Sequence, residues 1–424
     1  MTPGEIRERL AELRRAGAGL RRRPARKTLH SLAQVLDGWS DPDSTWRRAL
    51  EAELPGATGF SPETVSEGLR RGLAHWNGQA LRTLAARELG ALERLDGSLH
   101  PMIAGFDATA VLLAGSIPMP SLLALVAPLL LRSPVLAKSA SRDPVTPRLV
   151  ARSIAEVDAE LGRCIVAVDF PGEDDERMAA LLEAGCIVAS GSDETVAAVR
   201  ARAAPPQRLV AYGHRLSVAA LGEAATQGTR LEDTARRLAL DVALWDQLGC
   251  LSPIVVYVEG ESASDAASEA LASALAEVEQ RMPRGMIEPR AAALIAHERA
   301  QAELRAAAGE RVCLHASDST AWTVVREARC GVLPAPLHRF VRVMPVADRA
   351  QLLEALAPLA PHLAATAIEG FGAATPRLAR DLAQLGASRV CAPGALQAPP
   401  LDWHHDGKGV LSPLARFTDL ELTT

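Results

Sequence analysis

Apolar residues recur at every third or fourth position through much of the first hundred residues, which is the spacing of one face of an α-helix. Asp41-Pro42 and Ser61-Pro62 predict helix starts there, because Asp and Ser cap helices and proline is tolerated in the first turn. The residues that carry the periodic pattern are Leu32, Val35, Leu36, Leu81, Leu84, Leu89 and Leu92. Residues 1–100 are therefore predicted to form a helical lead-in that packs on the domain after it.

The pattern changes at Ala108, where short apolar runs begin to alternate with helical stretches. The runs are ATAVLLAG, SPVLAKSA, CIVAVDFP, CIVASG, RLVAYG and SVAAL. This alternation predicts a parallel sheet with helices on both faces, whose ligands gather at the carboxyl ends of the strands. The most apolar stretch, Ser121 to Leu131, contains Pro128 and is about half as long as the ~20 residues that cross a bilayer. It is predicted to be a buried helix.

A second alternating region follows the first. A helix from about Arg230 to Gln247 breaks at Gly249-Cys250, and the strand PIVVYVEG comes directly after it. Further helices are expected at 262–282, 290–307 and 349–358, and further strands near 321–326, 339–345 and 389–392. The last residues read as a loop-like tail. The chain thus predicts an α/β protein in four parts, namely the lead-in, α/β domains over 101–225 and 226–395, and a tail over 396–424.

The amino-acid composition excludes several classes of function. The chain of 424 residues is 48% hydrophobic, carries a net charge of −5 and has only 3% aromatic residues, so nucleic acid is not an expected partner. Its six cysteines form no CxxC pair, which argues against a disulfide framework or a zinc site and favours a reducing cytoplasm. The amino-terminal segment has no apolar core of the kind that secretory signals contain.

Three places carry candidate chemistry by residue type. Cys250 lies where a helix gives way to a strand, although a lone cysteine is more often a core residue than a nucleophile. Lys138 ends an apolar strand at the edge where cofactors bind, with an ordinary surface lysine as the alternative. Gly191-Ser192 opens a helix after the strand CIVAS, so its N–H groups could hold phosphate, or Ser192 could simply cap the helix.

Other motifs point away from common enzyme classes. The GxGxxG fingerprint of ordinary Rossmann dehydrogenases is absent, as are a serine nucleophile elbow, HExxH and a Walker loop. The segment DWHHDG could suggest a metal site. His404 and His405 would point apart in an extended chain, however, and no third ligand is evident, so no metal is predicted.

The order of these pieces resembles the aldehyde dehydrogenase superfamily, and more narrowly the long-chain acyl-CoA reductases of bacterial luminescence. WDQLGCLSP and the closing WHHDG with RFTDLE are the most specific parts of a resemblance that runs from about Trp39 to Glu421. It implies an aldehyde dehydrogenase-like fold, with a cofactor domain over 101–225, a catalytic domain over 226–395, an oligomerising segment and a tail that returns toward the active site.

The resemblance also assigns residues to roles. Cys250 matches the catalytic cysteine, Lys138 the lysine at the adenosine ribose, and Gly191 with Ser192 the pair at the cofactor pyrophosphate. The same resemblance implies cofactor-binding positions at three further residues, which are Ser139, Gly115 and Pro118. Oxidising relatives carry an asparagine near Pro118–Pro120 that stabilises the oxyanion, and here it is missing. Backbone N–H groups, including that of Cys250, are expected to replace it.

A second departure from the oxidising relatives predicts the direction of the reaction. Those relatives use a glutamate, in a Glu-Leu-Gly-Gly run, to activate water against the acyl-enzyme; the stretch here is Ala211-Tyr212-Gly213-His214. Without that base, hydride transfer can compete with hydrolysis. His214 is a candidate to assist Cys250 or to move a proton, and a structural loop histidine is the alternative.

The expected activity is reduction of a long-chain acyl-CoA or acyl-protein to the aldehyde with NADPH, NADH being the alternative cofactor. The resemblance also implies a homo-oligomer and an acyl-protein synthetase partner. Three other readings stay open, namely NAD-dependent aldehyde oxidation, acyl-phosphate reduction on the same fold, and a non-catalytic acyl-carrying subunit.

Overall fold

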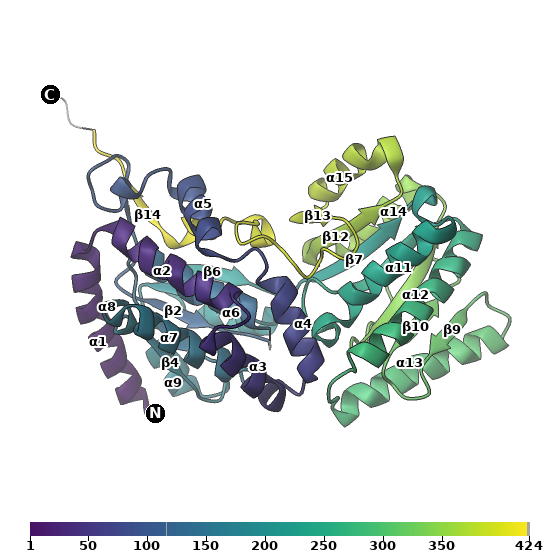
Figure 1. The fold of residues 1–424 in the computed structure, drawn as a ribbon, viewed down its shortest axis with the longest axis horizontal. Helices are drawn as coiled ribbons and strands as arrows, with labels where there is room; N and C mark the ends of the chain where they lie inside the picture. Colours follow the sequence, from purple (N-terminus) through teal and green to yellow (C-terminus); the bar gives the residue numbers. More distant parts are fainter. Residues whose placement is uncertain (116, 422–424) are drawn as a thin grey trace. The chain divides into compact units, whose positions relative to one another are not determined.

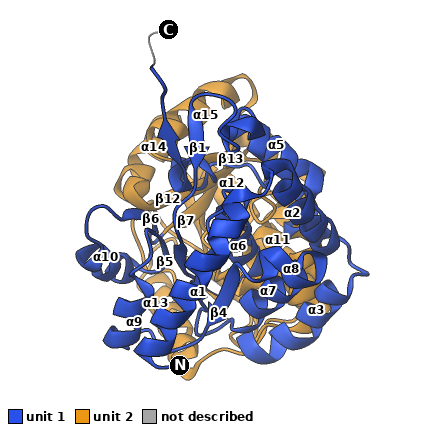
Figure 2. Ribbon diagram, turned by 90° about the vertical axis from the view of Figure 1, so that its left-hand side faces the viewer, with its two compact units in different colours: residues 1–58, 72–214, 400–424 blue, residues 59–71, 215–399 orange. Residues whose placement is uncertain are grey.

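The computed structural model describes residues 1–115 and 117–421, which form two compact units. The first unit contains residues 1–58, 72–214 and 400–424, and the second contains residues 59–71 and 215–399 (Figure 2). The first unit is thus assembled from three separate stretches of chain. Each unit is built around its own β-sheet.

The amino-terminal hundred residues are helical, as the apolar spacing predicts. The helices are α1 (Pro3–Arg22), α2 (Ala25–Ser40), α3 (Thr45–Thr58), α4 (Pro62–Gly72) and α5 (Gly78–Leu89), with a 3-10 turn at Leu92–Arg94. Ser61 caps α4, since its hydroxyl accepts from the N–H of Thr64 at 3.2 Å. The prediction of a helix start at Asp41-Pro42 was wrong. There Asp41 accepts from the N–H of Asp43 in a short turn, and α3 begins only at Thr45.

The first unit contains a five-stranded, wholly parallel sheet in the order β4-β3-β2-β5-β6. Its strands are β2 (Thr109–Leu112), β3 (Val135–Lys138), β4 (Ile165–Val168), β5 (Cys186–Ser190) and β6 (Arg208–Tyr212), each within a predicted run. The helices between them are α6 (Pro118–Leu130), α7 (Val145–Val157), α8 (Ala159–Gly162), α9 (Asp175–Leu181) and α10 (Asp193–Arg202) (Figure 1). Helix α6 contains the apolar stretch expected to be buried, and ten of its residues are buried.

The lead-in contributes directly to the core of this unit. Ile6, Leu10 and Leu13 of α1 are at most 1% exposed and pack in one cluster with Leu136 of β3 and Met178 of α9. Burying three such side chains stabilises the unit by about 1.5–3 kcal/mol each. Helix α1 is therefore an integral layer over the sheet.

The tail of the chain is more ordered than its sequence predicts. Strand β14 (Arg416–Thr418) pairs antiparallel with β1 (Met102–Ala104), so the tail forms a two-stranded sheet with the segment that precedes β2. The segment before β14 contains two 3-10 turns, His405–Gly407 and Ser412–Leu414. Strands of three residues carry too little periodicity to be recognised, because pairing with a distant partner decides them.

The second unit contains a seven-stranded sheet in the order β13-β12-β7-β8-β11-β10-β9, parallel except for the β10–β9 pair. The strands are β7 (Leu216–Leu221), β8 (Pro253–Glu259), β9 (Cys313–Ala316), β10 (Thr323–Arg326), β11 (Phe340–Val346), β12 (Leu363–Glu369) and β13 (Arg389–Cys391). The helices are α11 (Gly228–Ala243), α12 (Glu261–Arg281), α13 (Pro289–Ala307), α14 (Arg349–Leu356) and α15 (Thr375–Gln384), with short 3-10 turns at Glu223–Ala225, Leu244–Gln247, Ala357–His362 and Gly372–Ala374.

Sequence reasoning found most of these elements and missed three, β9, β12 and α15. The expected helix to Gln247 was also wrong at its end. Helix α11 stops at Ala243, and Trp245, Asp246 and Gln247 then take left-handed backbone angles with φ of 54°, 49° and 64°. Tertiary contacts described below hold these three residues in a conformation that their sequence does not favour.

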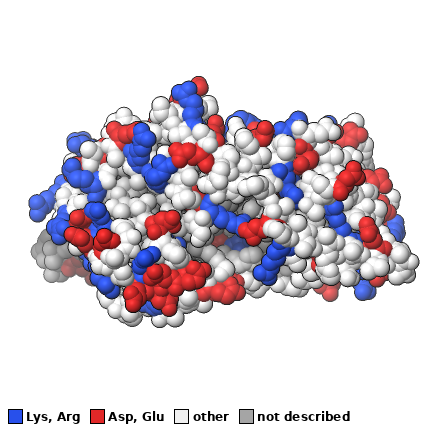
Figure 3. Space-filling model, turned by 90° about the horizontal axis from the view of Figure 1, so that it is seen from below, with Lys and Arg blue, Asp and Glu red and all other residues white. Residues whose placement is uncertain are grey.

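Two surface properties complete the description of the fold. Acidic and basic side chains both occur across the face drawn in Figure 3. Some surface charges form ion pairs within one unit, such as Arg7 with Glu183 at 2.6 Å. Among the described helices, none combines the length and the apolar character that crossing a membrane would require.

Candidate functional site

The five-stranded sheet has one topological switch point, between β2 and β5. Strands β3 and β4 follow β2 in the chain and lie on one side of it in the sheet. The chain then crosses back, and β5 and β6 lie on the other side of β2. Leu112, the last residue of β2, pairs with Ala189 of β5, so the loops that leave these two strands start side by side. In open parallel sheets, ligands bind in the crevice outside the carboxyl ends at such a point.

The loop after β5 contains the Gly191-Ser192 pair. Ser192 is the N-cap of α10, and its hydroxyl accepts from the N–H of Thr195 at 3.3 Å. The N–H of Gly191 donates to the carbonyl of Tyr212 on β6 at 3.1 Å. The N–H of His214 donates to Asp193 Oδ1 at 2.8 Å. The turn is thus fixed against the end of β6, with the amino end of α10 at the edge of the switch point.

The loop after β2 contains Gly115 and leads to Pro118, the first residue of α6. Gly115 has φ +79°, and a Cβ added there would meet no atom within 4 Å. The N-cap residue of α6 is Ile117, and among the described residues no side chain caps this helix end. The open space at Gly115 and the uncapped helix start suit an anionic ligand at the switch point.

Lys138 ends β3, one strand away from the switch point. It is only 7% exposed, so the surface-lysine interpretation was wrong. Its ammonium donates to the carbonyl of Ser139 at 3.2 Å and lies 5.3 Å from the centre of the Phe170 ring. Burial lowers the pKa of Lys138, and the carboxylates of Asp169 and Glu173 oppose that shift. A partly desolvated ammonium beside carboxylates suits the hydroxyl or phosphate groups of a ribose.

The first unit therefore gathers most of the predicted cofactor residues at one edge of its sheet. Gly115, Pro118, Lys138, Ser139, Gly191, Ser192 and His214 all lie at or just beyond the carboxyl ends of its strands. Their donors fit the phosphates and ribose of a dinucleotide, with Lys138 as the charged member. His214 is exposed, and its backbone N–H, which donates to Asp193, holds the residue in place.

Cys250 belongs to the second unit, just before β8. It lies in a turn closed by the N–H of Ser252, which donates to the carbonyl of Gly249 at 3.0 Å. The carbonyl of Cys250 accepts from the hydroxyl of Ser217, at the start of the neighbouring β7, at 2.8 Å. The residue is half-buried. Its backbone is thus fixed at the amino ends of two central strands.

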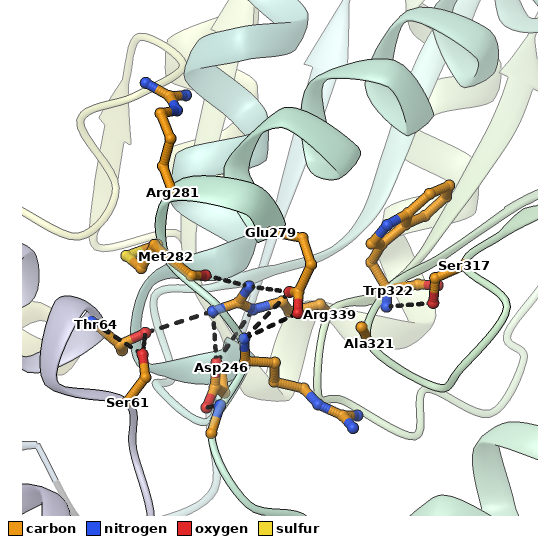
Figure 4. A network of polar contacts seen from close by, with 12 residues as sticks. Ser61, Thr64, Asp246, Glu279, Arg281, Met282, Ser317, Ala321, Trp322 and Arg339 are labelled. Atoms are coloured by element: carbon orange, nitrogen blue, oxygen red, sulfur yellow. Dashed lines mark hydrogen bonds and ion pairs between the residues drawn. The ribbon is translucent and has the colours of Figure 1, made fainter.

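Two left-handed turns support the loop that leads to Cys250. Trp245–Gln247 forms the first, and Leu337–Arg339, with φ of 65°, 57° and 66°, forms the second. Asp246 Oδ1 accepts from Arg339 at 2.8 and 3.1 Å, and both side chains are at most 3% exposed (Figure 4). The other Asp246 oxygen accepts from the N–H of Gly285 at 3.0 Å. Non-glycine residues in this conformation persist only where their surroundings hold them.

Further contacts join the same two turns. The amide of buried Gln247 donates to the carbonyls of Pro253 and Phe340 at 2.9 Å each, and its oxygen accepts from the N–H of Phe340 at 2.8 Å. Arg339 also donates to Glu279 and to the carbonyl of Met282, both at 2.8 Å. Gln247 thus ties the starts of β8 and β11 together, three residues before Cys250.

The five cysteines other than Cys250 are poorly suited to nucleophilic attack. Burial raises the pKa of Cys164 to about 11, of Cys186 to about 12 and of Cys391 to about 11. Burial also raises the pKa of Cys313 and of Cys330. These five side chains are protonated thiols at neutral pH, and the thiolate is the reactive form.

Asp241 of α11 ties the loop after β13 to the segment that contains Cys250. Its carboxyl accepts from the N–H of Gly394 at 2.6 Å and of Leu396 at 3.1 Å, while Gln397 bonds Ser252 Oγ at 2.7 Å. Burial raises the pKa of Asp241 from 3.8 to about 7, against the lowering effect of these backbone donors. Between these two values the folded state holds more protons than the unfolded chain, so this group makes stability fall as the pH rises.

Asp241→Asn is therefore expected to flatten the dependence of stability on pH. The variant cannot ionise, so the difference in urea midpoint between pH 5 and pH 8 should shrink relative to the parent protein. Exposed Asp233→Asn on the same helix is the matched control. An unchanged pH profile in Asp241→Asn would contradict a raised pKa at this carboxyl.

Sequence reasoning missed a cluster at the end of β6. His405 stacks on Tyr212, with ring centres 4.7 Å apart and 7° between the planes, and on Trp403 at 5.0 Å. Lys408 lies over the Tyr212 ring at 4.8 Å. The WHHDG motif contributes to the family resemblance and was also considered as a metal site, and neither interpretation predicts this stacking. No group of three metal-ligating side chains occurs within residues 1–115 and 117–421. The stacking depends on the tail folding back, which local sequence does not reveal.

Comparison with solved structures defines the class of fold. An oxidoreductase from Marinobacter aquaeolei matches with a TM-score of 0.74 at 15% identity, over 98% of this chain and 90% of that one. Indole-3-acetaldehyde dehydrogenase in complex with NAD⁺ matches with a TM-score of 0.75 at 13% identity, over 99% and 89%. The NADP-dependent glyceraldehyde-3-phosphate dehydrogenase from Bacillus halodurans, in complex with NADP, gives 0.72 at 14%, over 100% and 92%. The chain has an aldehyde dehydrogenase-like fold.

The family is narrower than the fold. Residues 21–417 match the family model Acyl-CoA reductase (LuxC), and the chain belongs to that family. The long-chain acyl-protein thioester reductase of Aliivibrio fischeri is 23% identical over 246 residues, which cover 54% of this chain and 50% of the relative. That of Vibrio harveyi is 24% identical over 233 residues, covering 53% and 48%. The aligned region spans about half the length of these curated relatives.

Proposed function

We propose that this protein reduces a long-chain acyl thioester to the fatty aldehyde, with Cys250 as the nucleophile and NADPH as the hydride donor. The observation that carries the proposal is the family match over residues 21–417, because it includes both Cys250 and the whole carboxyl edge of the five-stranded sheet. The names of the curated relatives, long-chain acyl-protein thioester reductases, support the choice of substrate class.

In the first half of the proposed reaction, the Cys250 thiolate attacks the acyl carbonyl. A bond forms between Cys250 Sγ and the acyl carbon while the substrate's own thioester bond breaks, the departing thiolate takes a proton from solvent, and an acyl-enzyme remains. The Ser217 and Gln247 contacts hold the backbone around Cys250 in place during this step. Backbone N–H groups near Cys250 are the proposed donors to the oxyanion.

In the second half, hydride reaches the acyl carbon, the carbon–sulfur bond to Cys250 breaks, and aldehyde leaves as the thiolate is restored. A bound nicotinamide cofactor supplies that hydride. Lys138, Ser139, Gly191 and Ser192 are the residues proposed to hold its ribose and phosphates. Ala211, at the position of the glutamate in oxidising relatives, cannot activate water, so the acyl-enzyme survives long enough to be reduced.

The decisive experiment is anaerobic turnover of acyl-CoAs of graded chain length with NADPH or NADH, followed at the nicotinamide absorbance, with the aldehyde identified by mass spectrometry. Stoichiometric aldehyde and thiol are expected, fastest with a long chain. Free acid as the product of acyl-CoA, or of aldehyde with NAD⁺, would instead identify a hydrolase or an oxidising dehydrogenase. Acyl transfer to Cys250 without consumption of NADPH or NADH would identify an acyl-carrying subunit.

A further inference from the structure

Lysine is nearly absent from this chain. Of its 46 basic residues only three are lysines, Lys27, Lys138 and Lys408, and all the others are arginines. Lys27 is exposed on α2, whereas Lys138 and Lys408 both lie at the carboxyl edge of the five-stranded sheet. Lysine and arginine are not interchangeable, because the ammonium is a compact point charge on a flexible stem whereas the guanidinium is wide and planar. The use of lysine at this edge therefore indicates two places that need an ammonium.

Lys408 contacts the end of β6 in two ways. Its ammonium donates to the carbonyl of Ala211 at 2.8 Å and lies 4.8 Å from the centre of the Tyr212 ring. Asp406 Oδ2 is 3.9 Å from the same nitrogen, and the Asp406 side chain is 1% exposed. The stacked ring of His405 covers Tyr212 as well. The side chains of the segment 405–408 thus hold Ala211 and Tyr212, the last two residues of β6.

Helix α5 fixes the segment that carries Lys408. Arg87 forms an ion pair with Asp402 before it. After it, the Glu88 carboxylate accepts from three successive N–H groups, those of Val410 at 2.7 Å and of Leu411 and Ser412 at 2.9 Å each. Because hydrogen bonds to a charged group contribute about 1.5–3 kcal/mol each, this anchoring is substantial. The segment is therefore a firm support for the end of β6.

The end of β6 in turn fixes the proposed phosphate turn. The carbonyl of Tyr212 accepts from Gly191 N–H at 3.1 Å, and the N–H of His214 donates to Asp193 at 2.8 Å. A side chain at Gly213 would collide with Asp193. Any shift of Ala211 and Tyr212 therefore moves Gly191 and the amino end of α10. The contacts run without a gap from Lys408 to the turn that contains Ser192.

We infer that Lys408 is a positioning residue for the cofactor, holding the Gly191–Ser192 turn in its phosphate-binding geometry through Ala211 and Tyr212. The inference rests on the proposed function, in that this turn binds the pyrophosphate. Lys408 acts with His405, whose ring stacks on Tyr212 and is itself stacked on Trp403. The ammonium itself contacts protein groups at β6, and its effect on the cofactor passes through the backbone.

The test compares Lys408→Met, Lys408→Arg and the control Lys27→Met with the parent protein. NADPH affinity is measured by nicotinamide fluorescence, and KM and kcat for NADPH are measured in aldehyde formation. Lys408→Met is expected to weaken NADPH binding and raise its KM about tenfold, the effect of one charge-assisted hydrogen bond. Its kcat at saturating NADPH should change less than about twofold. The substitution disturbs the Gly191–Ser192 turn that binds the cofactor, but it leaves Cys250 unchanged.

The controls separate this role from general destabilisation. Lys27→Met should bind NADPH like the parent, and Lys408→Arg should remain at least about threefold weaker, since a guanidinium cannot occupy the ammonium position. Labelling of Cys250 by acyl-CoA without cofactor should be unaffected in every variant. Should Lys408→Met fail to fold, Lys408→Arg provides the same comparison.

Three results would overturn the inference in different ways. Equal NADPH affinity in the parent, Lys408→Met and Lys408→Arg would refute the positioning role while leaving the proposed function intact. Absence of binding of NADPH and NADH by the parent itself would refute both. A fall in kcat with an unchanged KM and affinity would show that Lys408 acts in the chemical step and not on the cofactor turn.

Discussion

Replacing Cys250 by alanine should abolish aldehyde formation, with a loss in kcat/KM of at least about 10³-fold. The reason is chemical: without the thiol no acyl-enzyme forms, and hydride has no covalent intermediate to reduce. The variant should still bind NADPH with parental affinity, because the proposed cofactor residues belong to the other unit. Acyl labelling is measured by mass spectrometry of the intact protein after incubation with acyl-CoA.

Cys313→Ala is the matched control for this prediction. Cys313 is an exposed thiol on β9, and its loss should leave labelling and turnover unchanged. Peptide mapping of the labelled parent protein should place the acyl group on Cys250. Persistent labelling of the Cys250→Ala variant, with the label on another cysteine, would refute the assignment of the nucleophile.

Replacing Asp246 by alanine should destabilise the second unit by about 1–3 kcal/mol, the cost of leaving buried hydrogen-bond donors unsatisfied. Buried Arg339 would lose one of its two carboxylate partners and keep Glu279, and the N–H of Gly285 would lose its acceptor. Because the two left-handed turns are joined at this pair, Cys250 labelling should also become slower. Hydrogen exchange of the β8 and β11 amides in urea measures the stability of this region.

Asp233→Ala supplies the comparison, since its pair with Arg237 is largely exposed and should cost at most about 1 kcal/mol. The double variant Asp246→Ala with Arg339→Met should regain part of the lost stability, because it also removes the guanidinium donors that lose their acceptor in the single variant. A loss below about 1 kcal/mol in Asp246→Ala would contradict the role assigned to the buried pair.

The sheets and most helices could be predicted from the sequence because their signals are local. Each buried strand of the first sheet is a short apolar run, and α12 and α13 lie within two residues of their predicted bounds. Strand β12 and helix α15 were missed in a region with several prolines and glycines, where the local signals favour turns. The candidate residues at the edge of the first sheet were found for the same local reason, since each follows the end of an apolar run.

The sequence by itself determined the fold class, the family resemblance and the identity of the candidate thiol, because periodicity and motif order are properties of adjacent residues. Tertiary structure alone decided the left-handed turns at Trp245–Gln247 and the stacking of Tyr212, His405 and Lys408. In each case the structure depends on a partner that is distant along the chain, Arg339 for Asp246 and His405 for Tyr212. Conformations that the local backbone disfavours are stable there because the buried ion pairs and hydrogen bonds that hold them form only after the chain has folded.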